Sequence, residues 1–389
     1  MPTAPQRPRL LVLASTYPAG PDDATPGFVR DLARQEAAEF DTLVLVPRLP
    51  GTPAAERDGA LTVQRFRYFP RRWEDLADGA ILENLRRRRS RWLQVVPFLA
   101  AETYALRRAV RRHEPDVLHL HWILPQGLAA LVAARKVPWL VTTHGGEMYG
   151  LTGPLARRAM RAVLRRADAV TVVNDDLGRR VEQLTGTAPE VLPMGADVDA
   201  VRAGAGDRVP GRLLVVGRLV EKKGVGVLLD AVRGLDRPGW SLEVVGDGPL
   251  RAELERAAAG LPVVFRGALP RAGVSAALSR ADVVAVPSVP ASTGDQDGLP
   301  VTLLEAMAAG RAIVASRLPG IDAAVRDGET GVLVPPGDVP ALRAAIAALL
   351  GDPARRTALA DAARAHAEQF STGAAGERYR AVLRRLTDR

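Results

Sequence analysis

Several residue types are absent or scarce in this chain of 389 residues, and each absence excludes a class of chemistry. There is no cysteine, so the sequence excludes a disulfide framework, a thiolate metal site and a cysteine nucleophile. No run of about 18–20 uncharged apolar residues occurs, so we expect no membrane-spanning helix. The short apolar run at Leu10–Ala14 predicts a first β-strand rather than a signal peptide.

Lysine is scarce as well, with three lysines against fifty arginines, and two of the three are the adjacent Lys222 and Lys223. The net charge of +9 is concentrated, because residues 65–112 hold thirteen arginines against five acidic residues. Such a segment favours an anionic partner, which is nucleic acid, an anionic lipid surface or a phosphorylated substrate. A solvated helix face explains the segment equally well. Because 47% of residues are hydrophobic and 25% charged, wholesale disorder is excluded.

Short β-branched runs alternate with helical patterns along the whole chain, which predicts right-handed βαβ units and buried parallel sheets. We expect strands at 9–15, 42–46, 61–66, 117–121, 139–143, 169–173, 190–192, 212–216, 241–245, 263–266, 282–286, 312–315 and 331–334. A Gly-rich polar stretch at 203–211 predicts a linker between two domains. The fold class is therefore α/β, with two doubly wound, Rossmann-like domains whose ligands lie beyond the carboxyl ends of the strands.

The segment Gly217–Gly224 leaves a predicted strand and enters a helix, a place where glycine permits close approach and the helix N-terminus favours an anion. Arg218 and Lys223 can both face one diphosphate there. A solvent-exposed charged turn is the alternative. The glycine spacing matches no P-loop, which disfavours a nucleoside triphosphatase. No GxGxxG motif follows the first strand, which disfavours a dinucleotide-dependent dehydrogenase. A second tight turn, Gly246–Leu250, is a weak signal alone.

A third segment, residues 297–310, places two carboxylates at the start of a helix. Gly298 and Pro300 predict a turn, with Asp297 before the helix and Glu305 one to two turns inside it. Carboxylates accept hydrogen bonds only, so this pair suits sugar hydroxyls. The alternative is that Asp297 merely caps the helix.

Together these three segments resemble the family 4 retaining glycosyltransferases, which have the GT-B fold. The signature of that family is a pair of acidic residues with seven residues between them, followed by Ala-Met-Ala. Asp297 and Glu305 have this spacing, although the family usually has Glu where Asp297 stands. The resemblance covers most of the chain and is strongest over residues 212–337.

The resemblance implies an acceptor-binding domain over residues 1–200, a nucleotide-sugar-binding domain over 201–371, and a C-terminal helix at 372–389 that returns to the first domain. It implies transfer of a hexosyl or N-acetylhexosaminyl group from a nucleotide-sugar, with uridine as the expected base. The acceptor is then a hydroxyl of a glycan, a lipid-linked molecule or a natural product. No cofactor and no metal are expected.

For matched positions the resemblance implies specific roles. Arg218 and Lys223 bind the diphosphate, Glu305 holds the ribose, Asp297 holds the donor sugar, and His144 lies beside the transferred sugar. A satisfied structural histidine is the alternative for His144. Further donor-side candidates are Gly27, Gly217, Gly248, Arg266, Gly298, Leu299, Pro300, Val301 and Leu304. Acceptor-side candidates are Tyr17, His121 and Glu147.

Three other features bear on these roles. His119 and His121 alternate on a strand and share a face, but no further ligands suggest a metal. The loop from 20 to 27, with Asp22 and Asp23, corresponds to a flexible loop of the family near donor phosphate and acceptor. Met194 stands where the family's interdomain motif usually has Asn.

Two other classes stay open. A sugar-nucleotide epimerase or phosphorylase uses the same fold, and a membrane or nucleic-acid binder could use the basic segment, where arginines surround Trp92. We favour a cytoplasmic enzyme whose basic segment contacts the anionic inner face of the membrane, with no role for nucleic acid.

Overall fold

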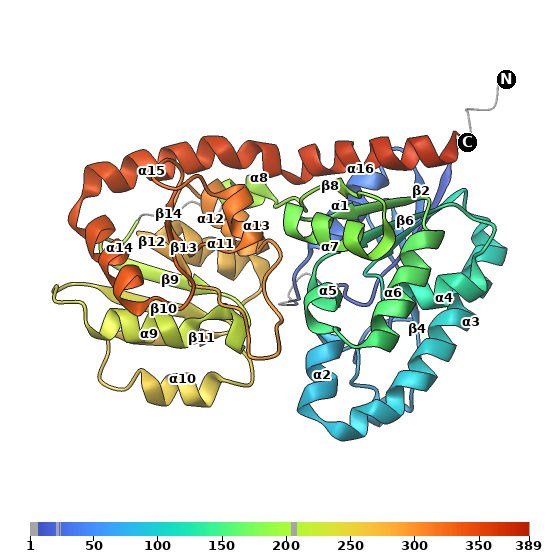
Figure 1. The fold of residues 1–389 in the computed structure, drawn as a ribbon, viewed down its shortest axis with the longest axis horizontal. Coiled ribbons are helices and arrows are strands. Elements are labelled where there is room, and N and C mark those ends of the chain that lie inside the picture. The colour runs from blue at the N-terminus through green and yellow to red at the C-terminus, as the bar shows by residue number, and fades with distance from the viewer. Residues whose placement is uncertain (1–6, 21–22, 24, 204–207, 389) are drawn as a thin grey trace.

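The chain forms two α/β domains side by side in a computed structural model that describes residues 7–20, 23, 25–203 and 208–388 (Figure 1). In each domain a sheet lies between layers of helices. This confirms the α/β fold class with two doubly wound domains.

The N-terminal sheet contains, within the described residues, eight strands in the order β3-β4-β2-β1-β5-β6-β7-β8. Neighbours are parallel except the β3–β4 pair. The strands are β1 (Arg9–Leu13), β2 (Asp41–Pro47), β3 (Ala55–Asp58), β4 (Leu61–Phe66), β5 (Val117–His121), β6 (Trp139–Thr143), β7 (Ala169–Val172) and β8 (Glu190–Val191). The helices are α1 (Phe28–Glu36), α2 (Ile81–Arg87), α3 (Val95–His113), α4 (Gln126–Ala133), α5 (Gly146–Gly150), α6 (Pro154–Arg166) and α7 (Asp175–Thr185), with 3-10 turns η1 (Arg71–Trp73) and η2 (Arg89–Gln94). Central strands β5 and β6 are buried throughout, as helices on both faces require.

The C-terminal sheet has the order β11-β10-β9-β12-β13-β14 in the described part of the chain, and all its pairs are parallel. The strands are β9 (Arg212–Val216), β10 (Ser241–Val245), β11 (Val263–Gly267), β12 (Val283–Val286), β13 (Ala312–Ser316) and β14 (Val332–Val334). The helices are α8 (Val198–Ala203), α9 (Val225–Arg233), α10 (Arg251–Ala257), α11 (Arg271–Arg280), α12 (Val301–Ala308), α13 (Pro319–Ala324), α14 (Val339–Gly351) and α15 (Pro353–His366), with 3-10 turns η3 (Glu221–Lys223) and η4 (Ala367–Phe370).

The final helix, α16 (Thr372–Thr387), crosses back to the N-terminal domain, and Figure 1 shows it in line with α15 along one side of the molecule. Arg380 on α16 pairs with Glu39 over 2.9 Å, and the Tyr379 hydroxyl donates to the carbonyl oxygen of Leu192 over 3.0 Å. The same hydroxyl lies 3.7 Å from the sulfur of the buried Met194. A methionine therefore fits this crossing because Tyr379 packs on it.

Short elements account for most differences from the sequence-based expectation. Strand β3 and helices α2, α5, α8 and α13 were not predicted, because four to seven residues are too few to display a period. From the sequence we expect a helix over 92–113, but α3 begins at Val95 because η2 precedes it. Asp22 and residues 204–207 of the expected linker lie outside the described residues. Among the described helices, none combines the length and apolar character needed to cross a bilayer.

Candidate active site

Lys223 and Asp297 form an ion pair between two loops at the carboxyl edge of the C-terminal sheet. Lys223 ends η3 after β9, and Asp297 lies between β12 and α12. The Lys223 Nζ donates to Asp297 Oδ2 over 2.9 Å, and the Ser288 hydroxyl donates to the same oxygen over 2.6 Å. Burial raises the pKa of Asp297, but the charges of Lys223 and Lys222 and the two hydrogen bonds outweigh burial and leave that pKa below its usual value. The carboxyl of Asp297 is therefore ionised near pH 7.

Two glycines allow the loops around this pair to pack closely. A Cβ on Gly224 would lie 1.8 Å from the carbonyl oxygen of Pro287, and a Cβ on Gly248 would lie 2.5 Å from that of Leu219. Both separations are far too short for real atoms, so these positions exclude any side chain. The backbone of Gly217 lies against Lys223, whose Cδ would be 3.4 Å from an added Cβ.

Arg218, the second expected cation, is held by the N-terminal domain. Its Nη1 lies 2.5 Å from Glu83 Oε2 on α2. From the same helix, Arg86 donates to the Thr293 hydroxyl over 3.2 Å. Helix α2 thus bridges to two loops of the C-terminal domain. Sequence reasoning missed Glu83, whose carboxylate would compete with a diphosphate for Arg218.

His144 follows β6 and lies among aromatic rings. Its ring stacks on that of His121 with 5.3 Å between centroids, and Nε2 lies 3.1 Å from His121 Nδ1. The rings of Phe28 and Trp122 lie 5.1 and 4.9 Å away. Burial, followed by the influence of His119, lowers the pKa of His144 to about 3. The imidazole is therefore neutral near pH 7 and suited to a hydrogen bond with a sugar hydroxyl.

His119 lies behind His121 and is fixed by protein partners at both nitrogens. Nδ1 lies 2.7 Å from Glu36 Oε1, and Nε2 lies 2.8 Å from the Thr142 hydroxyl. The rings of His119 and His121 have centroids 4.2 Å apart, so they share a face as expected. Across the described ranges, no group of three or more His, Asp or Glu side chains is arranged to hold a metal ion. His119 packs on His121, and His121 stacks on His144, so the two rings fix the position of the His144 imidazole.

The two domains meet at Gly298. The Asn174 side-chain amide donates to the Gly298 carbonyl over 2.8 Å, and a Cβ on Gly298 would lie 2.9 Å from the His144 carbonyl oxygen. Behind it, a Cβ on Gly320 would overlap the Gly298 carbonyl at 1.1 Å. Since the backbone is clamped from both sides, Asp297 and His144 flank one interdomain contact. Neither Asn174 nor Gly320 was predicted.

Glu305 projects from α12 beside an interdomain ion-pair cluster. Its carboxylate has no hydrogen-bond partner among the described residues. Burial raises the pKa of Glu305 to about 7, an effect that Arg271 reduces and that Asp31 and Asp197 reinforce. Arg271 itself pairs with Asp31 of α1 over 2.8 Å and with Asp197 over 3.3 Å. Glu305 is thus available to a ligand at the boundary between domains.

The other donor-side candidates occupy different environments. Leu299, Pro300 and Val301 form the turn into α12, where Pro300 takes the N-cap position, and Leu304 is buried in the core. Arg266 lies on the edge strand β11 and pairs with Glu243 over 3.1 Å. In the part of the chain that the structure describes, no contact joins Arg266 to the other candidates.

The acceptor-side candidates are largely engaged within the N-terminal domain. The buried Tyr17 donates its hydroxyl to Asp58 over 2.8 Å. The buried Glu147 accepts from the Ile123 amide and the Thr143 hydroxyl, each over 2.9 Å. Glu147 therefore braces the turn that carries His144. Gly27 takes the N-cap position of α1.

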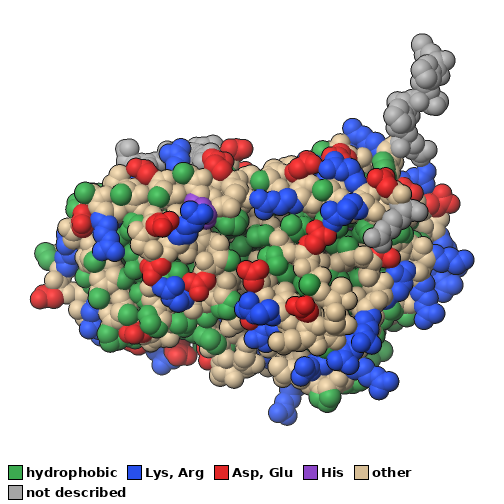
Figure 2. All heavy atoms as spheres, turned by 45° about the horizontal axis from the view of Figure 1, so that its top comes forward, with side chains coloured by type: hydrophobic (Ala, Val, Ile, Leu, Met, Phe, Trp, Pro, Cys, Tyr) green, Lys and Arg blue, Asp and Glu red, His purple; other side chains and the backbone are tan. Residues whose placement is uncertain are grey.

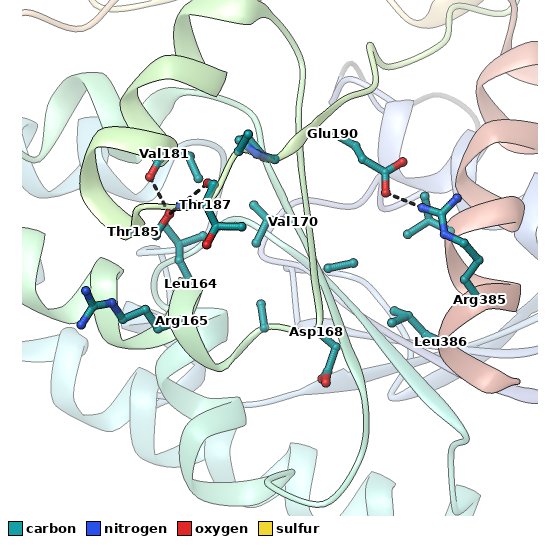
Figure 3. A pocket seen from close by; sticks show the side chains of 15 residues that line it. Leu164, Arg165, Asp168, Val170, Val181, Thr185, Thr187, Glu190, Arg385 and Leu386 are labelled. Carbon is teal, nitrogen blue, oxygen red and sulfur yellow. Dashed lines mark hydrogen bonds and ion pairs between the residues drawn. The ribbon is translucent and has the colours of Figure 1, made fainter. Parts of the chain in front are cut away.

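A cavity of about 320 Å³ lies elsewhere, at the edge of the N-terminal sheet beside α16 (Figure 3). Its lining comes from α6, α7, β8 and α16, and includes the Glu190–Arg385 ion pair. It contains no candidate residue, so the site is defined by the interdomain contact rather than by this cavity.

Comparisons with known proteins agree with the geometry. Residues 210–352 match the family model described as glycosyl transferases group 1, and residues 28–200 match glycosyltransferase family 4. The chain is 34% identical over 284 residues to a GDP-mannose-dependent alpha-(1-6)-phosphatidylinositol monomannoside mannosyltransferase of Mycolicibacterium smegmatis, which covers 67% of this chain and 73% of the relative.

Solved structures show the fold. A sucrose-phosphate synthase from Thermosynechococcus elongatus has a TM-score of 0.77 at 22% identity, over 98% of this chain and 99% of that chain. HepE of Anabaena in complex with UDP-glucose has a TM-score of 0.71 at 20% identity, over 97% and 99% of the two chains. The expected GT-B fold is confirmed.

Proposed function

Because this chain belongs to the group 1, family 4 glycosyltransferases, we propose that it transfers a sugar from a nucleotide-sugar to a hydroxyl group with retention of anomeric configuration. The observation that carries the proposal is the Lys223–Asp297 pair beside Gly298, whose backbone contacts the His144 carbonyl. A lysine and a carboxylate from the C-terminal domain and a neutral histidine from the N-terminal domain thus lie around one contact, which supports these roles for them.

In the proposed reaction, the bond between the anomeric carbon and the diphosphate oxygen breaks, and its electron pair stays on that oxygen. Lys223 and Arg218 stabilise the growing negative charge, which favours the transition state over the ground state. The acceptor oxygen bonds to the anomeric carbon and gives its proton to the departing diphosphate. We propose that these two cations do this without a metal ion.

The donor base is open to a direct test. The name of the mycobacterial relative specifies GDP-mannose, while the HepE structure contains UDP-glucose, and our expectation from the family is a UDP-sugar. A thermal-shift panel of UDP-, GDP-, ADP- and dTDP-sugars separates these, since a ligand at about 100 times its dissociation constant adds about 2.7 kcal/mol of stability. No shift with any member would contradict the proposal.

Product analysis tests the reaction itself. We expect a hexosyl or N-acetylhexosaminyl group to move only when a glycan, lipid-linked or natural-product hydroxyl is supplied. Product formed without an acceptor, or dependence on inorganic phosphate, would instead identify an epimerase or a phosphorylase. Anomeric inversion, read from NMR of the product, would refute retention.

We further propose peripheral contact with an anionic membrane through residues 65–112. Large apolar side chains stand exposed there, including Trp73, Trp92, Leu93 and Val96, and Figure 2 shows basic side chains gathered along this flank. Exposed Trp and Leu beside arginine are typical of interfacial segments. Trp92→Ser with Leu93→Ser should reduce sedimentation with phosphatidylglycerol vesicles, whereas Leu155→Ser on α6, at a still more exposed position, should not. Equal sedimentation of all variants, or tight binding of duplex DNA, would refute membrane contact as the role of this segment.

A further inference from the structure

Four arginines line a cavity of about 430 Å³ in the N-terminal domain, whereas the Lys223–Asp297 pair lies at the other sheet, in the C-terminal domain. They are Arg48, Arg67, Arg71 and Arg72, and the remaining lining is Glu74 and the turn from 49 to 52. The cavity is large enough for a phosphate or diphosphate group with part of the molecule that carries it.

The fold brings these arginines together from two strand ends and one turn. In the β2–β4 register Pro47 is opposite Phe66, so Arg48 and Arg67 leave the sheet at neighbouring positions. The Arg48 amide donates to the Phe66 carbonyl over 2.8 Å, which extends the ladder by one bond. Arg48 Nε donates to the Thr52 carbonyl over 3.0 Å and thereby fixes the turn that lines the cavity. Turn η1 contributes Arg71 and Arg72.

The four arginines of this cavity outnumber its one carboxylate, that of Glu74. Across the described ranges, no carboxylate pairs with any of its four arginines. Glu74, which lines the cavity, is buried, and its carboxylate accepts from the backbone amides of Tyr68 and Phe69 over 2.8 and 3.4 Å. By contrast, Arg65 pairs with Glu56 and Arg91 with Asp75, each over 2.8 Å. Like charges gathered without partners repel one another, and a bound anion relieves that repulsion.

The cavity lies on the same edge of the sheet as His144. Strands β2, β4 and β6 are parallel members of one sheet, so Arg48, Arg67 and His144 all follow carboxyl ends. Three to four strand spacings separate them, which is roughly 14–20 Å. A molecule with a hydroxyl at His144 can therefore place an anionic group in the cavity.

We propose that this cavity binds a phosphoryl group, as a phosphate or diphosphate, carried by the acceptor. Guanidinium groups match phosphate oxygens by paired hydrogen bonds, which favours phosphate over a single carboxylate. The assignment to an acceptor rests on the proposed transferase function, whereas anion binding by the cavity does not. The phosphoryl group comes either from a lipid headgroup or from a soluble phosphorylated molecule.

Trp73 provides a built-in probe, because the Arg72 guanidinium lies 4.0 Å from the centroid of its ring. Sodium pyrophosphate titrated into the full-length protein at 150 mM NaCl should change tryptophan fluorescence, and Trp73→Phe should abolish that change. Arg67→Ala with Arg71→Ala should weaken binding about tenfold or more. Arg107→Ala with Arg111→Ala, exposed arginines of α3 that lower the charge equally, should leave it unchanged. Equal affinity in both double variants would overturn the proposal.

Two further measurements identify the source of the phosphoryl group and test the anion site independently of the proposed transferase function. If Arg67→Ala with Arg71→Ala also loses sedimentation with vesicles of 30% phosphatidic acid in phosphatidylcholine, relative to the α3 pair, the group is a lipid headgroup. If vesicle binding is the same in both pairs while pyrophosphate binding differs, the group belongs to a soluble acceptor. Lys223→Ala should keep the Trp73 response. That response without any glycosyl transfer in the wild type would refute the proposed function and leave the anion site standing.

Discussion

The two domains differ in how their positive charges are paired, so the C-terminal domain is called the paired side below and the N-terminal domain the unpaired side. In the C-terminal domain, Lys223 is paired with Asp297 and Lys222 with Asp295, over 2.9 and 3.1 Å. On the N-terminal flank, most arginines of residues 65–112 are exposed, and those around the Arg48 cavity have no carboxylate partner in the described part of the chain. Buried charge is costly without a partner, whereas exposed charge is solvated. The paired side is built for a defined ligand geometry, and the unpaired side for attraction of an anion.

Removing the lysine of the paired side should have the largest effect. Lys223→Ala should lower kcat/KM about 100–1000-fold, by analogy with the loss of one oxyanion-hole donor, while circular dichroism stays native. The exposed Lys136→Ala is the matched control and should retain full activity. Wild-type turnover in Lys223→Ala would show that the paired side carries no catalysis.

Disturbing the interdomain contact between Gly298 and His144 should have the second-largest effect on activity. Gly298→Ala places a methyl group 2.9 Å from the His144 carbonyl oxygen and must push the domains or the loop apart. Because a displacement near 1 Å at the reacting groups costs about 100-fold, we expect a loss of that order in kcat. Gly153→Ala, where nothing lies within 4 Å of the new Cβ, should be silent. Equal kcat in the two variants would mean that this contact does not set the catalytic geometry.

Breaking the ion pair between Glu83 and Arg218, which joins the two domains, should have a modest effect that improves donor binding. Glu83→Gln removes the carboxylate charge that pairs with Arg218, so the donor diphosphate no longer competes with it for this guanidinium. We expect the donor KM to fall about two- to fivefold with kcat nearly constant, because partly exposed ion pairs contribute about 0.2–1 kcal/mol. Glu114→Gln, which breaks the exposed pair with Arg9, serves as control. A higher KM would mean that Glu83 helps to bind the donor.

The smallest expected effect is on thermal stability, and it concerns one buried carboxyl in each domain. Burial raises the pKa of Glu305 to about 7 and that of Glu102 in α3 to about 8. An acid whose pKa is raised on folding destabilises the fold as pH rises from about 4.5 through the folded pKa. Glu305→Gln and Glu102→Gln should therefore melt like the wild type near pH 4 and a few degrees higher above pH 8.

Donor nucleotide then separates the two carboxyls in the same melting experiment. Ribose hydroxyls that donate to Glu305 stabilise its charged form and should reduce the advantage of Glu305→Gln. They should leave that of Glu102→Gln unchanged, because Glu102 is fully buried between α3 and Gln126 of α4. A nucleotide effect of equal size on both variants would remove Glu305 from the donor site.

Much of this architecture was accessible from the pattern of residues. The long strands and helices matched because parallel strands buried on both faces are continuous apolar runs, and because the helices between them are amphipathic. The family resemblance implied that Lys223 and Asp297 serve one site, but their direct hydrogen bond was not predicted, since nothing local connects residues 74 apart. Helix α2 was not predicted. Its arginines indicated a solvated surface, and nothing local in the sequence indicated the contact between Arg86 and Thr293.

The sequence by itself determined the α/β alternation, the glycine turns after β9 and β10, and the basic character of one flank, since each depends on residues close in the chain. Only the tertiary structure decided that Glu83 pairs with Arg218 and that Asn174 and Gly320 contact Gly298. It also decided that Arg48 lines one cavity with Arg67 and Arg71. These contacts follow from strand order and domain docking, which bring distant residues together and leave no local periodic signal.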